Sequence, residues 1–141
     1  MISIIIPCYN EQNTLKKSTE KIFKYFENKK YDYEVIFINN ASTDNTLHVL
    51  NNLSKDYKII VLDESKKGKG NAVKKGLLNA NFDKVLIIDA DLSTDINELN
   101  EEWLSLDNKM LIGSRYLGNE IKTPLVRRLS GLILNIIIRF F

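Results

Sequence analysis

Cysteine and histidine are nearly absent from this sequence, and each shortage excludes a class of site. Cys8 is the only cysteine in 141 residues, so no disulfide can form within the chain. It has no partner base nearby in the sequence, so we expect a small buried residue rather than a nucleophile. His48 is the only histidine, and without a second histidine or a cysteine nearby it is a poor metal ligand.

Long apolar runs and a strong net charge are also missing. No apolar run reaches the roughly 20 residues that a membrane-spanning helix needs. The net charge of +2 gives no indication of nucleic-acid binding, so we expect no nucleic-acid partner. We expect no secretory leader, because the first apolar run follows the N-terminus without a charged segment or a small-residue cleavage site. Together with the lone cysteine, this favours a reducing, cytoplasmic setting.

The composition that remains is that of a globular domain with alternating elements. Hydrophobic residues make up 44% of the chain, enough for a core in a domain of this length. Pro7 is predicted to end the first strand, because proline cannot donate to a ladder. Predicted strands occupy 2–6, 34–38, 58–62, 84–88 and 110–113, and predicted helices lie around 14–26, 47–53, 72–80, 99–104 and 124–141. This alternation predicts an α/β fold with a mostly parallel sheet and flanking helices.

In an open parallel sheet, ligands bind beyond the carboxyl ends of the strands. Asp89 and Asp91 follow the fourth predicted strand. On extended backbone, residues two apart project to the same side, so the two carboxylates could present oxygen ligands to Mg²⁺ or Mn²⁺. The alternative is a solvated turn with helix-capping aspartates.

Polar side chains also follow the second predicted strand. Asn39 and Asn40 could hydrogen-bond the edge of a base or a ribose hydroxyl. Turn formation is the alternative for this segment. We favour it for Ser42 and for Asp44, which is a candidate cap of the next helix.

Basic residues lie at two further strand ends. The segment 67–71, which contains Lys69 between two glycines, precedes a helix whose amino end could attract phosphate. It lacks the pattern of a Walker loop, and a flexible basic loop is an equal alternative. Arg115 follows the fifth predicted strand and could hold a phosphate with two hydrogen bonds, or form a surface ion pair.

Five motifs resemble, in order, those of family 2 glycosyltransferases, and they cover nearly the whole chain. They are Ile4-Ile5-Ile6-Pro7-Cys8-Tyr9-Asn10-Glu11, the segment 34–46, Gly68-Lys69-Gly70-Asn71-Ala72 with Gly76, Asp89-Ala90-Asp91-Leu92-Ser93-Thr94, and Gly113-Ser114-Arg115. The last two are most similar to the polyprenyl-phosphate hexosyltransferases, including dolichyl-phosphate enzymes. The resemblance implies a nucleotide-diphospho-sugar transferase (GT-A) fold. It also implies an inverting, metal-dependent hexosyltransferase that uses a nucleotide-diphosphate sugar and a polyprenyl phosphate.

The resemblance also implies roles for individual residues. The nucleotide pocket would be lined by Pro7, Tyr9 and Glu11, while Asn39 and Asn40 would face the base. Asp89 would contact the ribose or the diphosphate, and Asp91 would hold the metal, Mg²⁺ or Mn²⁺. Lys69 belongs to the loop motif that we expect to contact the substrate, and Arg115 would help to hold the phosphates.

The chain departs from the family pattern in two places. Asn39-Asn40-Ala41 stands where the family usually has Asp-Asp-Gly, which removes charge from the base-binding motif. Family members also continue beyond the position of Phe141, so we expect a C-terminally truncated sequence. Two alternatives to the polyprenyl-phosphate enzyme therefore stay open: a transferase that extends a surface polysaccharide, and a non-catalytic fragment that binds a sugar nucleotide.

The last segment predicts contact with a membrane surface. We divide the chain into a nucleotide-sugar-binding domain at 1–123 and an amphipathic helix at 124–141. Arg127, Arg128 and Arg139 of this helix could meet anionic headgroups. Its uncharged run spans ten residues, 129–138. That is about 15 Å of helix against a hydrocarbon core of about 30 Å. We expect it to lie on the cytoplasmic face of the membrane, or else to pack against protein.

Overall fold

The computed structural model describes residues 1–99 and Ser105, which belong to one compact unit, Met1–Ser105. The predicted strand at 110–113, most of the predicted helix at 99–104 and the predicted helix at 124–141 lie outside the described residues. The division of the chain at residue 123 lies outside them as well. No helix in the described part is long and apolar enough to cross a membrane.

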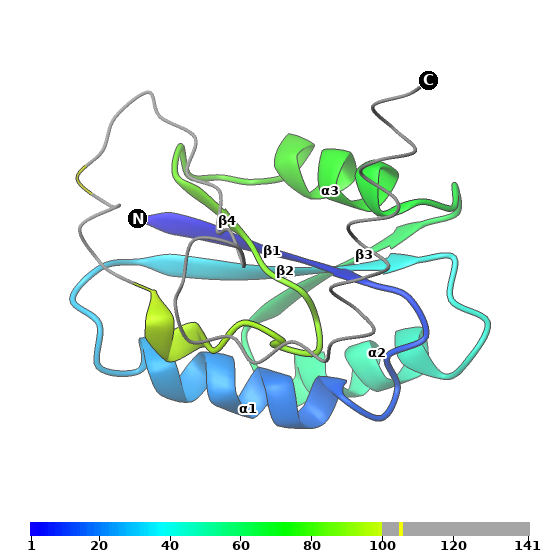
Figure 1. Cartoon of the computed structure of the whole chain (residues 1–141), viewed down its shortest axis with the longest axis horizontal. Helices are drawn as coiled ribbons and strands as arrows, with labels where there is room; N and C mark the ends of the chain where they lie inside the picture. The colour runs from blue at the N-terminus through cyan, green and yellow to red at the C-terminus, as the bar shows by residue number, and fades with distance from the viewer. Residues whose placement is uncertain (100–104, 106–141) are drawn as a thin grey trace, which may run out of the picture. The chain divides into compact units, whose positions relative to one another are not determined.

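Strands and helices alternate along the described part of the chain, as the sequence predicts (Figure 1). The strands are β1 (Ile2–Cys8), β2 (Tyr33–Asn40), β3 (Ile59–Glu64) and β4 (Val85–Ile87). The helices are α1 (Leu15–Phe26), α2 (Thr46–Asp56), α3 (Lys69–Leu78) and a 3₁₀ turn, η1 (Ile96–Glu98). The strands form one sheet in the order β3-β2-β1-β4, and every neighbouring pair is parallel. The predicted α/β class is confirmed.

Side chains alternate between the two faces of the central strands, and each face has its own helix layer. Ile4 and Ile6 of β1 belong to the core cluster that includes apolar residues of α1 and α2. Ile5 belongs to a second cluster, which includes Ala72 of α3. Figure 1 shows α1 and α2 on one side of the sheet and α3 on the other. Because both faces are covered, consecutive apolar residues occupy the centres of these strands, 4–6 in β1 and 35–38 in β2.

The prediction that Pro7 ends the first strand is wrong, because β1 continues to Cys8. The ladder explains why proline is tolerated there. The amide of Ser3 donates a hydrogen bond across the edge of β1 that faces β4. The carbonyl of Ile5 accepts from the amide of Ile88 across the same edge. Residues two apart on a strand direct their backbone N–H and C=O groups toward the same neighbouring strand, so the backbone of Pro7 also faces β4. Pairing with β4 ends at Ile5, and the missing N–H therefore costs no ladder bond.

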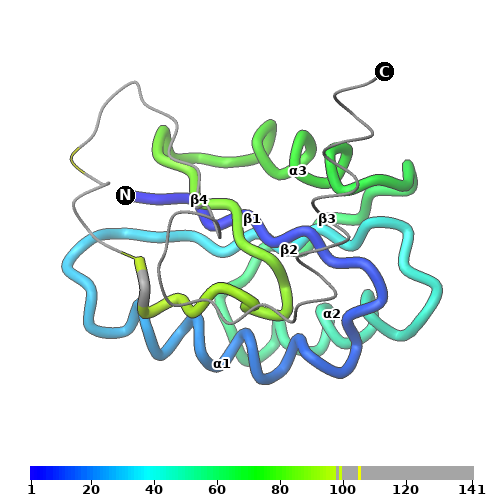
Figure 2. Tube along the Cα trace, viewed as in Figure 1, coloured from blue at the N-terminus to red at the C-terminus, as the bar shows by residue number. Residues whose placement is uncertain are grey.

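The strand order changes direction between β1 and β4. The chain moves outward from β1 to β2 and β3, and β4 is then added on the opposite side of β1. Such a switch point leaves a crevice at the carboxyl ends of the strands, where α/β proteins bind ligands. Figure 2 shows the loops that follow β1, β2 and β3 gathered at one end of the sheet.

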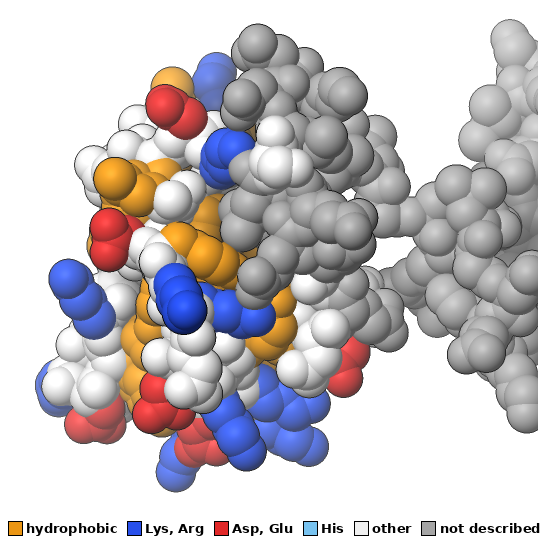
Figure 3. All heavy atoms as spheres, turned by 90° about the vertical axis from the view of Figure 1, so that its left-hand side faces the viewer, with side chains coloured by type: hydrophobic (Ala, Val, Ile, Leu, Met, Phe, Trp, Pro, Cys, Tyr) orange, Lys and Arg blue, Asp and Glu red, His pale blue; other side chains and the backbone are white. Residues whose placement is uncertain are grey.

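The opposite end of the sheet, where the strands begin, faces the viewer in Figure 3. Acidic and basic side chains are interspersed there among apolar ones. At this end Glu34 accepts hydrogen bonds from the Ser3 hydroxyl (2.5 Å) and from the amide of Asn81 (2.7 Å). Burial alone would raise the pKa of Glu34, but these hydrogen bonds stabilise the carboxylate and leave its pKa lowered. The network ties the loop before β4 to the sheet.

Candidate functional site

A cavity of about 620 Å³ lies at the carboxyl ends of the strands, where the switch point predicts it. The end of β2 and the loops after β1, β3 and β4 contribute to it. Seven of the residues singled out in the sequence line it: Pro7, Tyr9, Glu11, Asn40, Lys69, Asp89 and Asp91. Asn39 does not line it, and Arg115 lies outside the described residues. The cavity is also lined by Lys67 and Gly68 of the segment 67–71, and by Cys8 and Ala90, for which we predicted no role.

Asp89 and Asp91 reach the cavity from a turn and not from extended backbone. β4 ends at Ile87, and the amide of Leu92 donates to the carbonyl of Asp89 at 3.0 Å. Leu92 has a φ of 50°, the left-handed conformation that closes this turn. The premise of an extended Asp-x-Asp pair was therefore wrong. Asp89 and Asp91 still line the same cavity, and Ala90 between them is buried.

Two lysines face acidic and aromatic partners across the cavity. The ammonium of Lys69 forms an ion pair with Asp89, although both side chains are largely exposed. Lys67 lies over the ring of Tyr9, with its Nζ 5.0 Å from the ring centroid. Exposed pairs of this kind contribute little to stability, so both lysines can exchange these partners for an anionic ligand at small cost.

Glycine is required at one position of the loop that carries these lysines. Gly68 has a φ of +126°, which residues with a Cβ rarely adopt. Its amide donates to Oδ1 of Asn40 (2.8 Å), and Nδ2 of Asn40 donates to the carbonyl of Lys66 (2.9 Å). The buried amide of Asn40 uses both ends to fix the loop at the cavity edge. The contact of Asn40 with a base stays a prediction.

Asn39 is buried next to Asn40 on β2 but does not itself line the cavity. Its Nδ2 donates to a carboxylate oxygen of Asp63 at 2.7 Å, from the position opposite it on β3. On its other side it is in register with Cys8, which lines the cavity. Its Oδ1 has no hydrogen-bond partner among the described residues. The sequence gave no signal for the contact with Asp63, because the two residues lie on separate strands.

Side chains of the loops after β1 and β2 hold those loops together. Asn10, with a φ of 57°, accepts the amide of Thr43 at 2.8 Å and donates its own amide to Ser42 at 3.1 Å. Asp44 accepts the amides of Thr46 (2.9 Å) and Gln12 (3.3 Å). Partial burial alone would raise the pKa of Asp44, but these bonds and one from the Thr46 hydroxyl lower it. Ser42 and Asp44 thus have the turn role that we favoured. Asn45 occupies the N-cap position of α2 but makes no side-chain cap hydrogen bond, whereas Asp44 accepts the amide of the first helical residue, Thr46.

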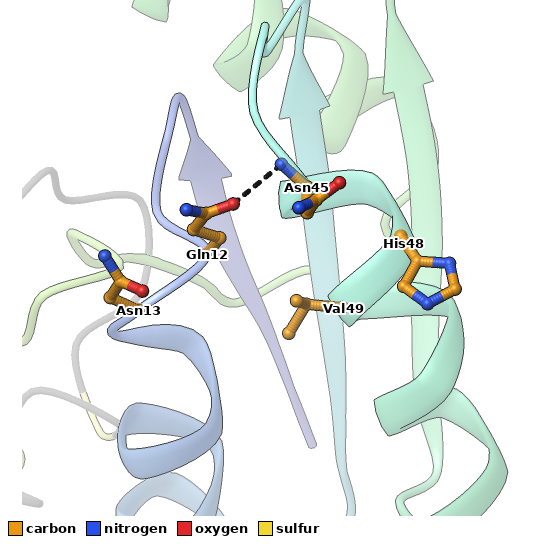
Figure 4. A pocket seen from close by; sticks show the side chains of 5 residues that line it. All are labelled: Gln12, Asn13, Asn45, His48 and Val49. Carbon is orange, nitrogen blue, oxygen red and sulfur yellow. Dashed lines mark hydrogen bonds between the residues drawn. The ribbon is translucent and has the colours of Figure 1, made fainter.

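Cys8 and His48 agree with their predicted roles as ordinary residues. Burial, helped by the negative charge of Glu11, raises the pKa of the Cys8 thiol, which stays protonated at neutral pH. His48 is exposed on α2 and interacts with Asn52. With four other residues it lines a second, open cavity of about 570 Å³ near the starts of α1 and α2 (Figure 4). Gln12 in that cavity accepts the amide of Asn45 at 2.9 Å.

The donor atoms at the larger cavity limit the metals that could bind. Within the described residues there is no group of three or more His, Cys, Asp or Glu side chains arranged to hold a metal. Asp91 is exposed and accepts the amide of Ser93, and Asp89 is paired with Lys69. One or two carboxylates suit a hard cation such as Mg²⁺ that takes its remaining ligands from phosphate and water. They do not suit a structural zinc site.

Comparison with known proteins identifies the family. Residues 3–139 match the model of glycosyl transferase family 2. The chain is 30% identical to dolichyl-phosphate beta-glucosyltransferase ALG5D of Trichomonas vaginalis, over 97% of this chain and 47% of that protein. It is 32% identical to poly-beta-1,6-N-acetyl-D-glucosamine synthase of Staphylococcus aureus, over 67% of this chain and 22% of that protein. The chain thus spans about half the length of the dolichyl-phosphate relatives that it matches.

A solved structure shares the fold. The mannosyltransferase PcManGT from Pyrobaculum calidifontis, in complex with GDP-Man and Mn²⁺, superposes with a TM-score of 0.57 at 26% identity. The match covers 64% of this chain and 27% of that protein. The parallel sheet is therefore that of a GT-A glycosyltransferase, as the resemblance implied. By its motifs, its fold and the match over residues 3–139, the chain belongs to glycosyltransferase family 2.

Proposed function

We propose that the cavity binds a nucleotide-diphosphate sugar, and that the whole protein transfers the hexose to a polyprenyl phosphate. The observation that carries this proposal is the convergence of three strand-end loops and the end of β2 on one cavity. In this arrangement Tyr9 offers an aromatic face for the nucleotide, and Lys67 and Lys69 offer positive charge for the diphosphate. Arg115 is proposed to add a further phosphate contact.

A divalent cation, Mg²⁺ or Mn²⁺, is proposed to bind through Asp91. When bound, such a cation neutralises the charge that develops on a diphosphate leaving group. Asp91 is exposed at the cavity, which suits a ligand that must admit water and phosphate oxygens. Asp89 is a second carboxylate of the cavity and is proposed to contact the ribose or the diphosphate. The complex of PcManGT with GDP-Man and Mn²⁺ supports a divalent cation at a site of this fold.

The acceptor is proposed to be a lipid phosphate, as in the dolichyl-phosphate relatives. A phosphomonoester with a second pKa of about 6 is already largely ionised at neutral pH. It needs no general base, and direct attack on the face opposite the diphosphate would invert the anomeric carbon. We propose that the segment 124–141 lies on the cytoplasmic face of the membrane, where such a phosphate would be met.

The similarity to poly-beta-1,6-N-acetyl-D-glucosamine synthase favours a second candidate function, the extension of a surface polysaccharide. A sugar hydroxyl as acceptor would need a general base. The third candidate, a non-catalytic module that binds a sugar nucleotide, is favoured by the loss of both motif carboxylates at Asn39 and Asn40. Transfer of labelled sugar to polyprenyl phosphate, to an oligosaccharide or to neither distinguishes the three.

The experiment that tests the proposal is calorimetric titration of nucleotide-diphosphate sugars with and without Mn²⁺. We expect Asp91→Ala to abolish the Mn²⁺-dependent part of the affinity while the circular dichroism spectrum stays unchanged. Asp95→Ala is the matched control, because Asp95 is also exposed, accepts hydrogen bonds from Asn97 and does not line the cavity. Unchanged metal-dependent affinity in Asp91→Ala would refute the role given to that carboxylate.

A further inference from the structure

Helix α3 turns its largest apolar side chains outward. The small residues Ala72 and Gly76 are the buried ones of this helix, whereas Leu77 is 47% exposed and Leu78 is 75% exposed. In a surface helix the apolar side chains normally face the core. Leu78 is also the most exposed large hydrophobic residue in the described part of the chain. The outer side of α3 therefore lacks the polar character that solvent alone would require.

Packing on the sheet fixes this orientation of α3. Gly76 approaches the sheet so closely that a Cβ there would lie 2.5 Å from Ile5 and 3.0 Å from Ile38. A rotation of the helix that buried Leu77 would bring a leucine side chain into this space, which the packed core does not admit. Figure 1 shows α3 as the only described helix on its side of the sheet, so no other described helix covers the leucines.

The same region of the chain is strongly basic. The segment 65–82 contains five lysines and no acidic residue, although the whole chain carries a net charge of only +2. Four of these lysines are exposed: Lys66, Lys67, Lys69 and Lys74. Lys74 lies three and four residues before the two leucines, which places all three side chains on one side of the helix. Positive charge and apolar surface are thus combined on the outer side of α3.

This combination fits the surface of an anionic membrane. The acyl region would receive the leucines, and the headgroup phosphates would receive the lysines. A nucleic acid would use the lysines only and would leave the leucines in water. Lys67 and Lys69 also line the large cavity, so the basic surface continues from α3 to the cavity mouth. A lipid phosphate acceptor would have to be met at that mouth, which favours a lipid partner over a protein.

We propose that the outer side of α3, formed by Lys74, Leu77 and Leu78, docks on the anionic surface of a membrane. This inference deepens the proposed function, and its choice of a lipid partner rests on the lipid acceptor proposed there. The contact is additional to the one proposed for the segment 124–141, because it uses residues of the unit Met1–Ser105. Docking through α3 would hold the cavity mouth beside the headgroups.

Fluorescence from position 78 tests the contact directly. Leu78→Cys allows an environment-sensitive dye to be attached there, because Cys8, the only native cysteine, is 1% exposed and is protected from labelling. The full chain is mixed with vesicles of phosphatidylcholine that contain rising fractions of phosphatidylglycerol. We expect a blue shift that grows with the phosphatidylglycerol fraction. Labelled Lys17→Cys is the matched control and should show no shift, because Lys17 is exposed on α1, on the other side of the sheet.

Unlabelled variants measure the two contributions by vesicle co-sedimentation. Lys74→Glu should weaken binding to anionic vesicles by about tenfold, because a negative charge then faces the headgroups. Leu78→Ser should weaken binding by about fivefold at every lipid composition, because less apolar surface leaves the water. Lys17→Glu changes the net charge equally and should alter binding by less than about twofold, because charges remote from the surface are screened. Circular dichroism checks that each variant is folded.

The outcomes separate docking from the proposed function. A shift confined to the dye at position 78, with binding weakened by Lys74→Glu and not by Lys17→Glu, supports docking through α3. Equal shifts from both dye positions, or equal weakening by both charge reversals, overturn it. A dye at position 78 that is shielded without vesicles also overturns it, because protein then covers the leucines; shielding that grows with protein concentration identifies a second copy of the chain as the cover.

Nucleotide binding gives the independent readout. If calorimetric titration shows intact binding of a nucleotide-diphosphate sugar while docking through α3 fails, the inference is overturned and the proposed cavity function stands. If docking succeeds but every nucleotide sugar fails to bind, the proposed function is overturned and the docking surface stands.

Discussion

Replacement of Gly76 by alanine tests how closely α3 packs on the sheet. A Cβ at this position would lie 2.5 Å from Cγ2 of Ile5 and 3.0 Å from Cδ1 of Ile38. Both isoleucines are fully buried in the centre of the sheet, so neither can move aside cheaply. Gly76→Ala therefore forces a shift of α3, and α3 carries the lysine loop at its amino end.

The expected magnitude is the difference between two opposing effects. Overpacking of a core costs about 1–3 kcal/mol. Exchange of glycine for alanine inside a helix gains about 1 kcal/mol. We therefore expect Gly76→Ala to lower the free energy of unfolding by about 1–2 kcal/mol, since the contact at 2.5 Å lies at the severe end of the range.

Gly70→Ala is the matched control in the same helix. A Cβ at Gly70 would meet nothing within 4 Å, and its backbone needs no left-handed conformation. We expect this variant to be as stable as the wild type or up to about 1 kcal/mol more stable. Urea unfolding followed by circular dichroism measures both variants. If Gly76→Ala proves as stable as Gly70→Ala, the close approach of α3 to β1 is refuted.

Two further predictions concern pH and membranes. The pKa of Glu34 is lowered in the folded state, so its contribution to stability is present above the ordinary value of 4.5 and is lost as the pH falls below it. In urea titrations at pH 6 and pH 3, Glu34→Gln should lose less stability on acidification than the wild type, and an equal loss would contradict the network with Ser3. Liposome co-sedimentation should rise with anionic lipid content and weaken when Arg127 and Arg128 become Glu; identical sedimentation of both proteins would count against the interfacial helix.

The sequence alone determined the order and type of the elements from β1 to β4, whereas the 3₁₀ turn η1 was not predicted. Runs of mostly apolar residues such as 2–6 predict strands buried on both faces, because a sheet covered on both sides has no solvent-facing positions. The rule that ligands bind beyond the carboxyl ends of parallel strands selected the candidate residues, and seven of them line one cavity. Five motifs in order were enough to indicate the family, which the match over residues 3–139 then confirmed.

Tertiary structure decided everything that depends on a neighbouring strand. Pro7 remains within β1 because β4 is too short to need its amide, and no local pattern reveals the length of a neighbour. Asn40 fixes the lysine loop because β3 brings Lys66 and Gly68 beside it. The buried amide of Asn39 donates to Asp63, 24 residues along the chain. Side-chain partners of this kind follow from strand order and register, whereas periodicity records only which face of its own element a residue occupies.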